Sequence, residues 1–197
     1  MDTLVKKDCL GKKLIYIKME IDFKKHIRTI VDYPIKGVHF RDITSLLEEP
    51  KAFKECITKL SVEAAKFDAN CIVGIESRGF VFGAPIATKF ELPLILARKP
   101  DKLPNKTVSK HFQLEYGETE LHIQEISPIE GKVCIVDDLV ATGGTALACA
   151  DLIHEHWNID KANILILAVI DLPGLNGSNL IKEQGYYVKT LIEYEGA

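Results

Sequence analysis

The most informative stretch of the chain is K-V-C-I-V-D-D-L-V-A-T-G-G-T, residues 132–145. Its near-continuous apolar start is typical of a strand buried on both faces, and its small residues lead into a helical pattern over 143–157. Strand-like runs and helical patterns also alternate on either side, at 70–75, 79–90, 92–97, 162–170 and 186–194. We therefore predict an α/β fold, in which a mostly parallel, twisted sheet is flanked by helices.

Two segments ahead of this alternation also have helical spacing. Four apolar residues are spaced as on one face of an amphipathic helix: Phe23, Ile27, Ile30 and Val31. Their spacing predicts a helix over 21–31. Pro50 predicts the start of a second helix, which we expect to end near Phe67.

The length of the chain and one long segment with few apolar residues indicate how the domain is organised. A chain of 197 residues fits a single domain, which we place at 19–197 after a tail at 1–18 that is expected to be disordered. Residues 98–121 contain two prolines, four lysines and few apolar residues. Connections of this length are usually functional lids or disordered segments. We expect 98–121 to be a long flexible lid loop, with a solvated surface excursion as the alternative.

Composition excludes several classes of protein. The chain carries 25 Lys and Arg against 28 Asp and Glu, a formal net charge of −3, which argues against a general nucleic-acid or membrane-surface binder. The longest apolar run, Ile164–Ile170, is far shorter than the roughly 18 residues of a membrane span. Five cysteines without a C-x-x-C pair make disulfides and a structural zinc site unexpected, so we predict a cytoplasmic protein.

Residues 136–145 have the chemistry of a sugar-phosphate site. Ligands of open α/β sheets bind beyond the carboxyl ends of the strands, where Asp137 and Asp138 are expected. The next residues offer unhindered backbone N–H groups and two hydroxyls that suit a phosphate dianion: Ala141, Thr142, Gly143, Gly144 and Thr145. The two carboxylates would repel a phosphate, so they suit sugar hydroxyls or a Mg²⁺ ion held through water. An acidic helix cap before a glycine turn is the alternative.

Basic residues elsewhere suit a second anion. Arg78 lies where a predicted strand ends and a helix begins, so its guanidinium and nearby backbone amides can face an anion. Arg98, Lys99 and Lys102 form a basic cluster that suits a pyrophosphate, to which Arg offers bidentate contact and Lys a point charge. A surface salt bridge for Arg78 and a solvated basic loop are the alternatives.

Two further features suit a planar base and a proton transfer. Phe40 and Arg41 place an aromatic face beside a guanidinium, which is a good seat for a purine, although a core aromatic is the alternative for Phe40. Glu115 lies late in the long loop. If the loop closes and excludes water, the pKa of this carboxyl rises, and it becomes a proton donor or acceptor near neutral pH. A solvated acid is the alternative.

These stretches together resemble a known enzyme family. Residues 136–145 are similar to the phosphoribosyl-pyrophosphate signature of the type I phosphoribosyltransferases. Four more stretches resemble the adenine phosphoribosyltransferases: G-V-H-F-R-D at 37–42, I-E-S-R-G-F-V-F-G at 75–83, R-K-P-D-K-L-P at 98–104 and L-E-Y-G at 114–117. The resemblance covers about residues 21–195 in the same order, and the joint occurrence of the motifs is highly specific.

The resemblance implies a reaction and a fold. The enzyme would transfer 5-phosphoribosyl from phosphoribosyl pyrophosphate to adenine, giving AMP and pyrophosphate in purine salvage, with Mg²⁺ and as a homodimer. The fold would be that of the type I phosphoribosyltransferases, with a small N-terminal hood over 19–50 that binds the base. A transferase for xanthine or hypoxanthine is one alternative, and a non-catalytic sensor of phosphoribosyl pyrophosphate is another. Residues 1–18 are too short for the DNA-binding module of such a regulator.

The resemblance also implies residue roles. Glu115 would be the general acid/base and Tyr116 would help to close the lid. The basic cluster would hold pyrophosphate, and one of its residues would reach the active site of the neighbouring subunit. In the hood, Phe40 would stack on adenine and Arg41 would approach the ring, while the main chain at His39 would read the base. Two positions depart from the family pattern: His39 replaces an aliphatic residue, and Asp101 replaces a glycine.

Overall fold

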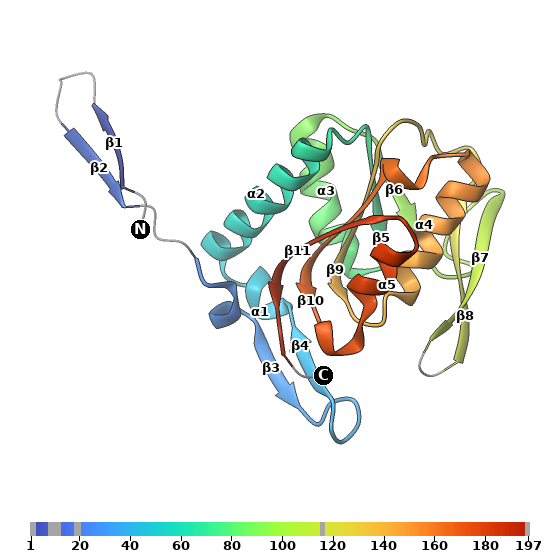
Figure 1. The fold of residues 1–197 in the computed structure, drawn as a ribbon, viewed down its shortest axis with the longest axis horizontal. Coiled ribbons are helices and arrows are strands. Elements are labelled where there is room, and N and C mark those ends of the chain that lie inside the picture. Colours follow the sequence, from blue (N-terminus) through green and yellow to red (C-terminus); the bar gives the residue numbers. More distant parts are fainter. Residues whose placement is uncertain (1–2, 8–12, 18–20, 115–116, 196–197) are drawn as a thin grey trace.

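The centre of the molecule is a five-stranded parallel sheet (Figure 1). The computed structural model describes residues 3–7, 13–17, 21–114 and 117–195. The sheet has the order β11-β10-β9-β5-β6, with strands β5 (Cys71–Ile75), β6 (Leu94–Ala97), β9 (Val133–Val140), β10 (Ile164–Asp171) and β11 (Tyr187–Glu193). The predicted α/β fold with a parallel sheet is confirmed.

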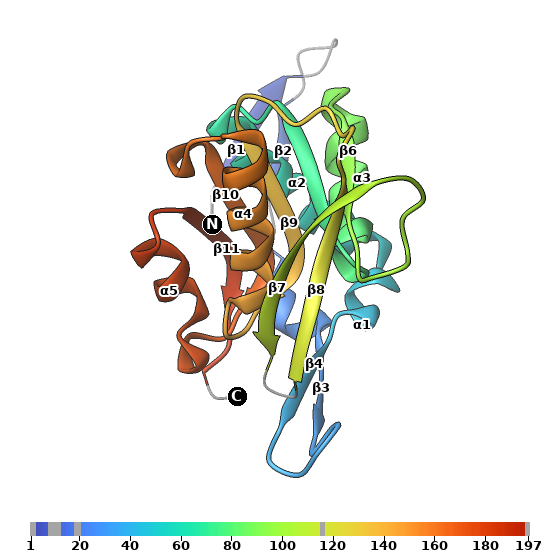
Figure 2. The ribbon, with the colours of Figure 1, turned by 90° about the vertical axis from the view of Figure 1, so that its right-hand side faces the viewer.

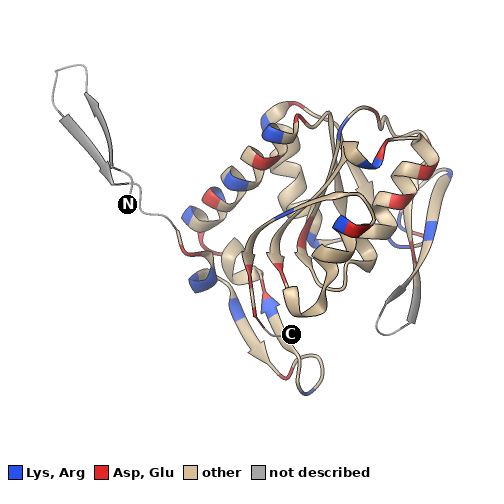
Figure 3. Ribbon diagram, viewed as in Figure 1, with Lys and Arg blue, Asp and Glu red and all other residues tan. Residues whose placement is uncertain are grey.

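Helices cover both faces of the sheet: α2 (Pro50–Phe67), α3 (Arg78–Phe90), α4 (Gly144–Trp157) and α5 (Gly177–Glu183). Helix α2 begins at Pro50. Proline has no backbone N–H, which costs nothing here because an N–H in the first turn has no acceptor within the helix. The helix is ended by Asp68, which adopts the left-handed conformation. Acidic and basic positions are interspersed along this helix (Figure 3). Within the described residues, none of the helices combines the length and apolar composition that a membrane span requires.

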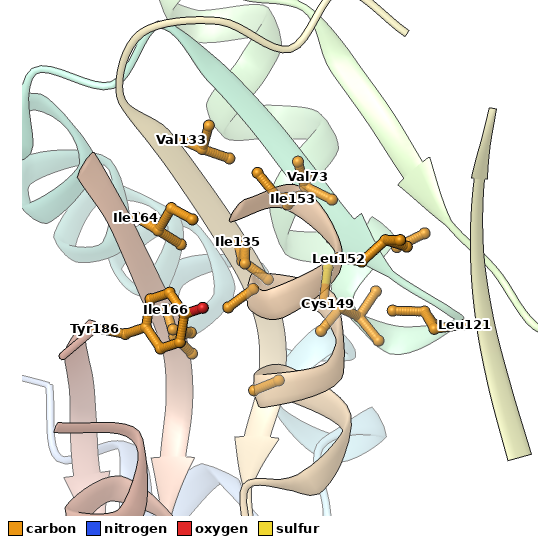
Figure 4. Close-up of a cluster of buried hydrophobic side chains, with 14 of the residues drawn as sticks. Val73, Leu121, Val133, Ile135, Cys149, Leu152, Ile153, Ile164, Ile166 and Tyr186 are labelled. Atoms are coloured by element: carbon orange, nitrogen blue, oxygen red, sulfur yellow. The ribbon is translucent and has the colours of Figure 1, made fainter. Parts of the chain in front are cut away.

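The core has two parts, one on each face of the sheet. Ile72, Cys134 and Leu165 point to the face covered by α2 and α3. Val73 and Ile135, their neighbours along the strands, point to the face covered by α4, where Cys149, Leu152 and Ile153 also pack (Figure 4). Because both faces are buried, the strands are apolar at nearly every position, which explains the continuous runs in the sequence.

The predicted helix over 21–31 is wrong. This segment forms a short 3-10 helix η1 (Phe23–His26) and strand β3 (Arg28–Val31), which pairs antiparallel with β4 (His39–Asp42). Phe23 and Ile27 are buried, but Ile30 and Val31 are exposed. The four residues with helical spacing therefore do not lie on one face of a single helix. The hairpin and the short helix α1 (Thr44–Leu47) lie within the segment predicted to be the hood, and we use that name for them.

Residues 98–121 contain secondary structure that the sequence pattern did not predict. Strands β7 (Thr107–Leu114) and β8 (Gly117–Gln124) pair into an antiparallel hairpin, which lies beside α4 (Figure 2). Leu121 and Ile123 of β8 are buried at alternate positions, and Val108 and Phe112 of β7 pack against the same core cluster, whereas the other residues of the hairpin are largely polar. A few apolar side chains thus suffice to hold the hairpin against the core, and they are too few to give a recognisable strand pattern in the sequence. The lid role of this segment stays a prediction.

The chain before residue 19 also contains strands. Strands β1 (Thr3–Lys7) and β2 (Lys13–Ile17) pair antiparallel in the segment expected to be a tail. This hairpin lies apart from the central sheet (Figure 1).

Candidate active site

A cavity lies where the order of the strands reverses. After β5 the chain moves outward to β6, and it then returns to the other side of β5 to form β9. The connections that follow β5 and β9 therefore lead to helices on opposite faces of the sheet, α3 and α4, and the space between such connections is the usual place for a ligand in an open α/β sheet. The cavity has a volume of about 370 Å³ and is lined by parts of three segments: 75–78, 137–146 and the hairpin β7–β8, together with Lys99.

The loop after β9 forms the floor of this cavity. We call residues 141–145 the phosphate-binding loop, after the role that the sequence predicts for them, and all five line the cavity. Gly143 has φ +82°, a left-handed conformation that a residue with a side chain rarely adopts, and α4 begins immediately after it. Backbone N–H groups in a first helical turn have no acceptor within the helix, so those of α4, with the hydroxyls of Thr142 and Thr145, are available to an anion; the anion itself stays a prediction.

Asp137 and Asp138 stand at the wall of the cavity beside Arg78. The Arg78 Nε lies 3.0 Å from the Asp138 Oδ2, and the Asp138 backbone N–H donates a 2.8 Å hydrogen bond to the Asp137 carboxylate. Burial and the neighbouring Asp138 carboxylate raise the pKa of Asp137 well above its usual value. Burial also raises the pKa of Asp138, although the Arg78 guanidinium acts in the opposite direction. Burial thus makes both carboxyl groups harder to ionise than a solvated aspartate.

Close backbone packing positions Arg78. The next residue, Gly79, is buried against β9, where a Cβ would lie only 2.3 Å from the carbonyl oxygen of Val136. The turn between β5 and α3 can therefore approach β9 this closely only with glycine at that position. The peptide bond between Glu76 and Ser77 in this turn is cis.

The basic cluster divides between two roles. The Arg98 guanidinium forms two contacts of 3.2 Å with the Glu76 carboxylate and donates a 2.9 Å hydrogen bond to the carbonyl of Lys102. Glu76 also accepts the Lys99 backbone N–H at 3.0 Å. Within the described residues, Lys99 is the member of the cluster that lines the cavity, while Arg98 and Lys102 do not. Asp101 has φ +61°, so it adopts the left-handed turn that glycine would otherwise supply.

The hood lies beside the cavity, and its residues do not line it. Arg78 connects the two, because its guanidinium carbon is 5.8 Å from the centre of the Phe40 ring. Arg41 is held by the Thr29 hydroxyl at 2.6 Å and by the Tyr194 ring, whose centre is 4.2 Å from the guanidinium carbon. Within the described residues, the buried Arg41 Nε has no hydrogen-bond partner. His39, at the edge of the hood, is exposed.

Several cavity residues were not predicted from the sequence. Glu76, Phe112 and Glu120 line the cavity, and Glu120 contacts two imidazoles, His111 at 3.0 Å and His122 at 2.9 Å. Glu76 lies inside the motif at 75–83, which is the only sequence signal that pointed to it; the hairpin residues had none. The predicted acid/base Glu115 and its neighbour Tyr116 lie outside the described residues.

Comparison with known proteins identifies the family. Residues 42–169 match the phosphoribosyl transferase domain. The adenine phosphoribosyltransferase of Desulfosudis oleivorans is 42% identical over 177 residues, which cover 89% of this chain and 99% of the relative. The enzyme of Fervidobacterium nodosum is 46% identical over 165 residues, 83% of this chain and 95% of the relative. The chain belongs to the adenine phosphoribosyltransferase family.

Solved structures of adenine phosphoribosyltransferases have the same fold. The Thermoanaerobacter pseudethanolicus enzyme superposes with a TM-score of 0.79 at 39% identity, over 88% of this chain and 98% of that chain. The Giardia lamblia enzyme, complexed with 9-deazaadenine, gives a TM-score of 0.82 at 28% identity, over 88% and 97%. The predicted fold and enzyme class are therefore confirmed, and the chain is a pentosyltransferase.

Proposed function

We propose that the cavity between β5 and β9 transfers 5-phosphoribosyl from phosphoribosyl pyrophosphate to adenine in purine salvage. One observation carries the proposal: a phosphate-binding loop, a buried acidic pair and a cationic side chain meet in one cavity, next to an aromatic hood. In the reaction, an imidazole nitrogen of adenine bonds to the anomeric carbon. The bond from this carbon to pyrophosphate breaks, and its electron pair leaves with the pyrophosphate oxygen.

The phosphate-binding loop would hold the 5-phosphate of the sugar. Its N–H groups and hydroxyls carry no negative charge, and the α4 N-terminus adds a favourable dipole for an anion. Asp137 and Asp138 line the same cavity and would accept hydrogen bonds from the ribose hydroxyls. Such bonds would place the anomeric carbon between the loop and Arg78.

The leaving pyrophosphate would be stabilised by positive charge at the opposite side. Arg78 is half exposed at the cavity, and Lys99 lines it too, so both can contact an anion there. Arg98 supports this arrangement indirectly, because its ion pair with Glu76 holds the segment that carries Lys99. Charge neutralisation at a leaving group is usually a large part of catalysis.

A Mg²⁺ ion that accompanies pyrophosphate fits this cavity. Asp137 and Asp138 supply the oxygen ligands that Mg²⁺ prefers, and within the described residues no three His, Cys, Asp or Glu side chains form a separate metal cage. We therefore expect the ion to be held through water, at Asp137 above all. When bound, it supplies further charge neutralisation on the pyrophosphate.

The hood would bind adenine, and the lid would complete the site. Phe40 offers a ring face for stacking, Arg41 offers an unpaired buried Nε, and the main chain at His39 would read the base. Glu115 would accept the proton from the imidazole nitrogen as the new bond forms, and Tyr116 would help to close the lid. Closure would exclude water, which would otherwise hydrolyse the activated sugar.

We also propose a cytoplasmic homodimer. Val81 lies in the first turn of α3, close to Arg78, while Phe90 ends this helix and Leu94 begins β6; all three are exposed apolar side chains. Covering them with a second copy would remove apolar area from water. Size-exclusion chromatography with light scattering measures the molar mass directly. A monomer at the working concentration of the enzyme would contradict the proposed dimer.

The decisive experiment is turnover with phosphoribosyl pyrophosphate, Mg²⁺ and competing bases. Adenine should be consumed, with AMP and pyrophosphate formed in equal amounts, while hypoxanthine and xanthine in the same mixture should be left. If the enzyme consumes a 6-oxopurine in preference to adenine, the 6-oxopurine is the substrate and the proposal of adenine is wrong. Absence of pyrophosphate release with every base would contradict the transferase function.

A further inference from the structure

The connection after β10 packs directly against the phosphate-binding loop. The Leu172 backbone N–H donates a 3.1 Å hydrogen bond to the carbonyl of Val140, at the end of β9. The Gly177 backbone N–H donates another, also 3.1 Å, to the carbonyl of Ala141. These two bonds tie both ends of residues 172–177 to the point where the loop begins.

Gly177 leaves no space for a side chain in this contact. A Cβ at this position would lie 2.2 Å from the carbonyl oxygen of Ala141 and 2.6 Å from the backbone nitrogen of Gly143. In the other direction, a Cβ on Gly143 would lie 3.0 Å from the Gly177 carbonyl oxygen. All these neighbours are backbone atoms, so a change of rotamer cannot relieve the clash. The loop itself would have to move.

We propose that Gly177 is a positioning residue for the phosphate-binding loop. Gly177 does not line the cavity, and it acts by letting the start of α5 support the loop from behind. This contact fixes the distance between the loop and the end of β9, and therefore the direction of the N–H groups that face the cavity. The inference rests on the proposed function of the loop as the seat of the sugar 5-phosphate.

The matched pair of variants is Gly177→Ala and Gly174→Ala. Both residues belong to the same connection, but a Cβ at Gly174 would meet no atom within 4 Å, and its φ is an ordinary one. Displacement of a binding group by about 1 Å can cost about 10²-fold in rate. We expect Gly177→Ala to raise the KM for phosphoribosyl pyrophosphate at least tenfold and to change the KM for adenine less than about twofold. Gly174→Ala should match the wild type.

The readouts separate positioning from general damage. Unchanged KM values in Gly177→Ala would overturn the proposal, and so would an equal rise in the KM of both substrates. If the wild type uses another base, the proposal that adenine is the substrate is wrong. The proposal for Gly177 is then tested with that other base, by the same comparison of KM values.

A measurement on the wild type covers the case in which Gly177→Ala does not fold. Ribose 5-phosphate should slow hydrogen exchange at the Gly177 amide together with the amides of residues 141–145. Protection of the loop without protection of Gly177 would overturn the inference. If ribose 5-phosphate protects neither segment, the loop is not the phosphate seat, and the proposal falls with it.

Discussion

Replacing Gly79 by alanine tests whether the turn that carries Arg78 depends on close backbone packing. The new methyl group would lie 2.3 Å from the Val136 carbonyl oxygen, whereas ordinary contacts begin at 3.4 Å. The turn must therefore move away from β9 by about 1 Å, since the neighbouring atom belongs to the backbone of a central strand. Overpacking of this kind typically costs about 1–3 kcal/mol of the free energy of unfolding.

Gly83→Ala is the matched control on the same helix. A Cβ at Gly83 would have its closest contact with the Ile72 Cγ2 at 3.4 Å, which is ordinary van der Waals contact. Alanine is better than glycine in a helix interior by about 1 kcal/mol, so Gly83→Ala should be neutral or stabilising. We thus expect the two variants to differ by about 1–4 kcal/mol, with Gly79→Ala the less stable.

Urea unfolding of both variants, followed by circular dichroism, measures this difference. Steady-state kinetics adds a second reading, because Arg78 would move with the turn while Asp138 stays in β9. A displacement of about 1 Å should lower kcat/KM for phosphoribosyl pyrophosphate by about 10²-fold in Gly79→Ala. Equal stabilities and equal kinetics in the two variants would refute the argument that the 2.3 Å approach constrains the site.

Three further predictions concern other parts of the site. Glu115→Ala should lower kcat by about 10²–10⁴-fold with little change in substrate binding, and near wild-type turnover would remove Glu115 from the mechanism. Tyr194→Leu should raise the KM for adenine severalfold more than that for phosphoribosyl pyrophosphate, because Arg41 loses the ring that supports it; steady-state kinetics with each substrate varied decides. Burial would raise the pKa of Glu76, but Arg98 and the backbone N–H of Lys99 outweigh it, so the pKa is lowered below 4.5. The stability that Glu76 contributes is therefore present above that value and lost as the pH falls through the native pKa, so the stability difference between wild type and Glu76→Gln should shrink as the pH is lowered below 4.5.

The sequence predicted the central sheet well, because its strands are buried on both faces. Residues such as Ile72 and Val73 point to opposite core clusters, so each strand is apolar throughout and is easily recognised. The acidic pair and the phosphate-binding loop were predicted for a related reason. The acidic pair lies in the last part of β9 and the loop directly follows this strand, and the carboxyl edge of a parallel sheet is where ligands bind.

The elements that were missed depend on contacts between distant parts of the chain. Ile30 pairs with Phe40 in the hood hairpin, and no local period reveals that partner. The ion pair between Glu76 and Arg98 joins residues that are 22 positions apart, so the sequence did not reveal it. The basic cluster was therefore predicted to act as one group, whereas in the structure Arg98 pairs with Glu76 and Lys99 lines the cavity. Gly177 gave no signal either, since its role depends on backbone atoms of a loop that precedes it by more than thirty residues.

The buried acidic pair shows why the site needs such rigid support. Burial raises the pKa of both Asp137 and Asp138, which means that their ionised forms destabilise the free protein. Arg78 offsets part of this from one side, and sugar hydroxyls or a cation would offset more on binding. A flexible strand would relieve the repulsion by turning the carboxylates toward water. Strand β9 cannot do so, because it is paired with β5 up to Val136 and with β10 along its whole length, and it is packed between two core clusters. The central sheet therefore holds the two acids in place, ready for a ligand that satisfies them.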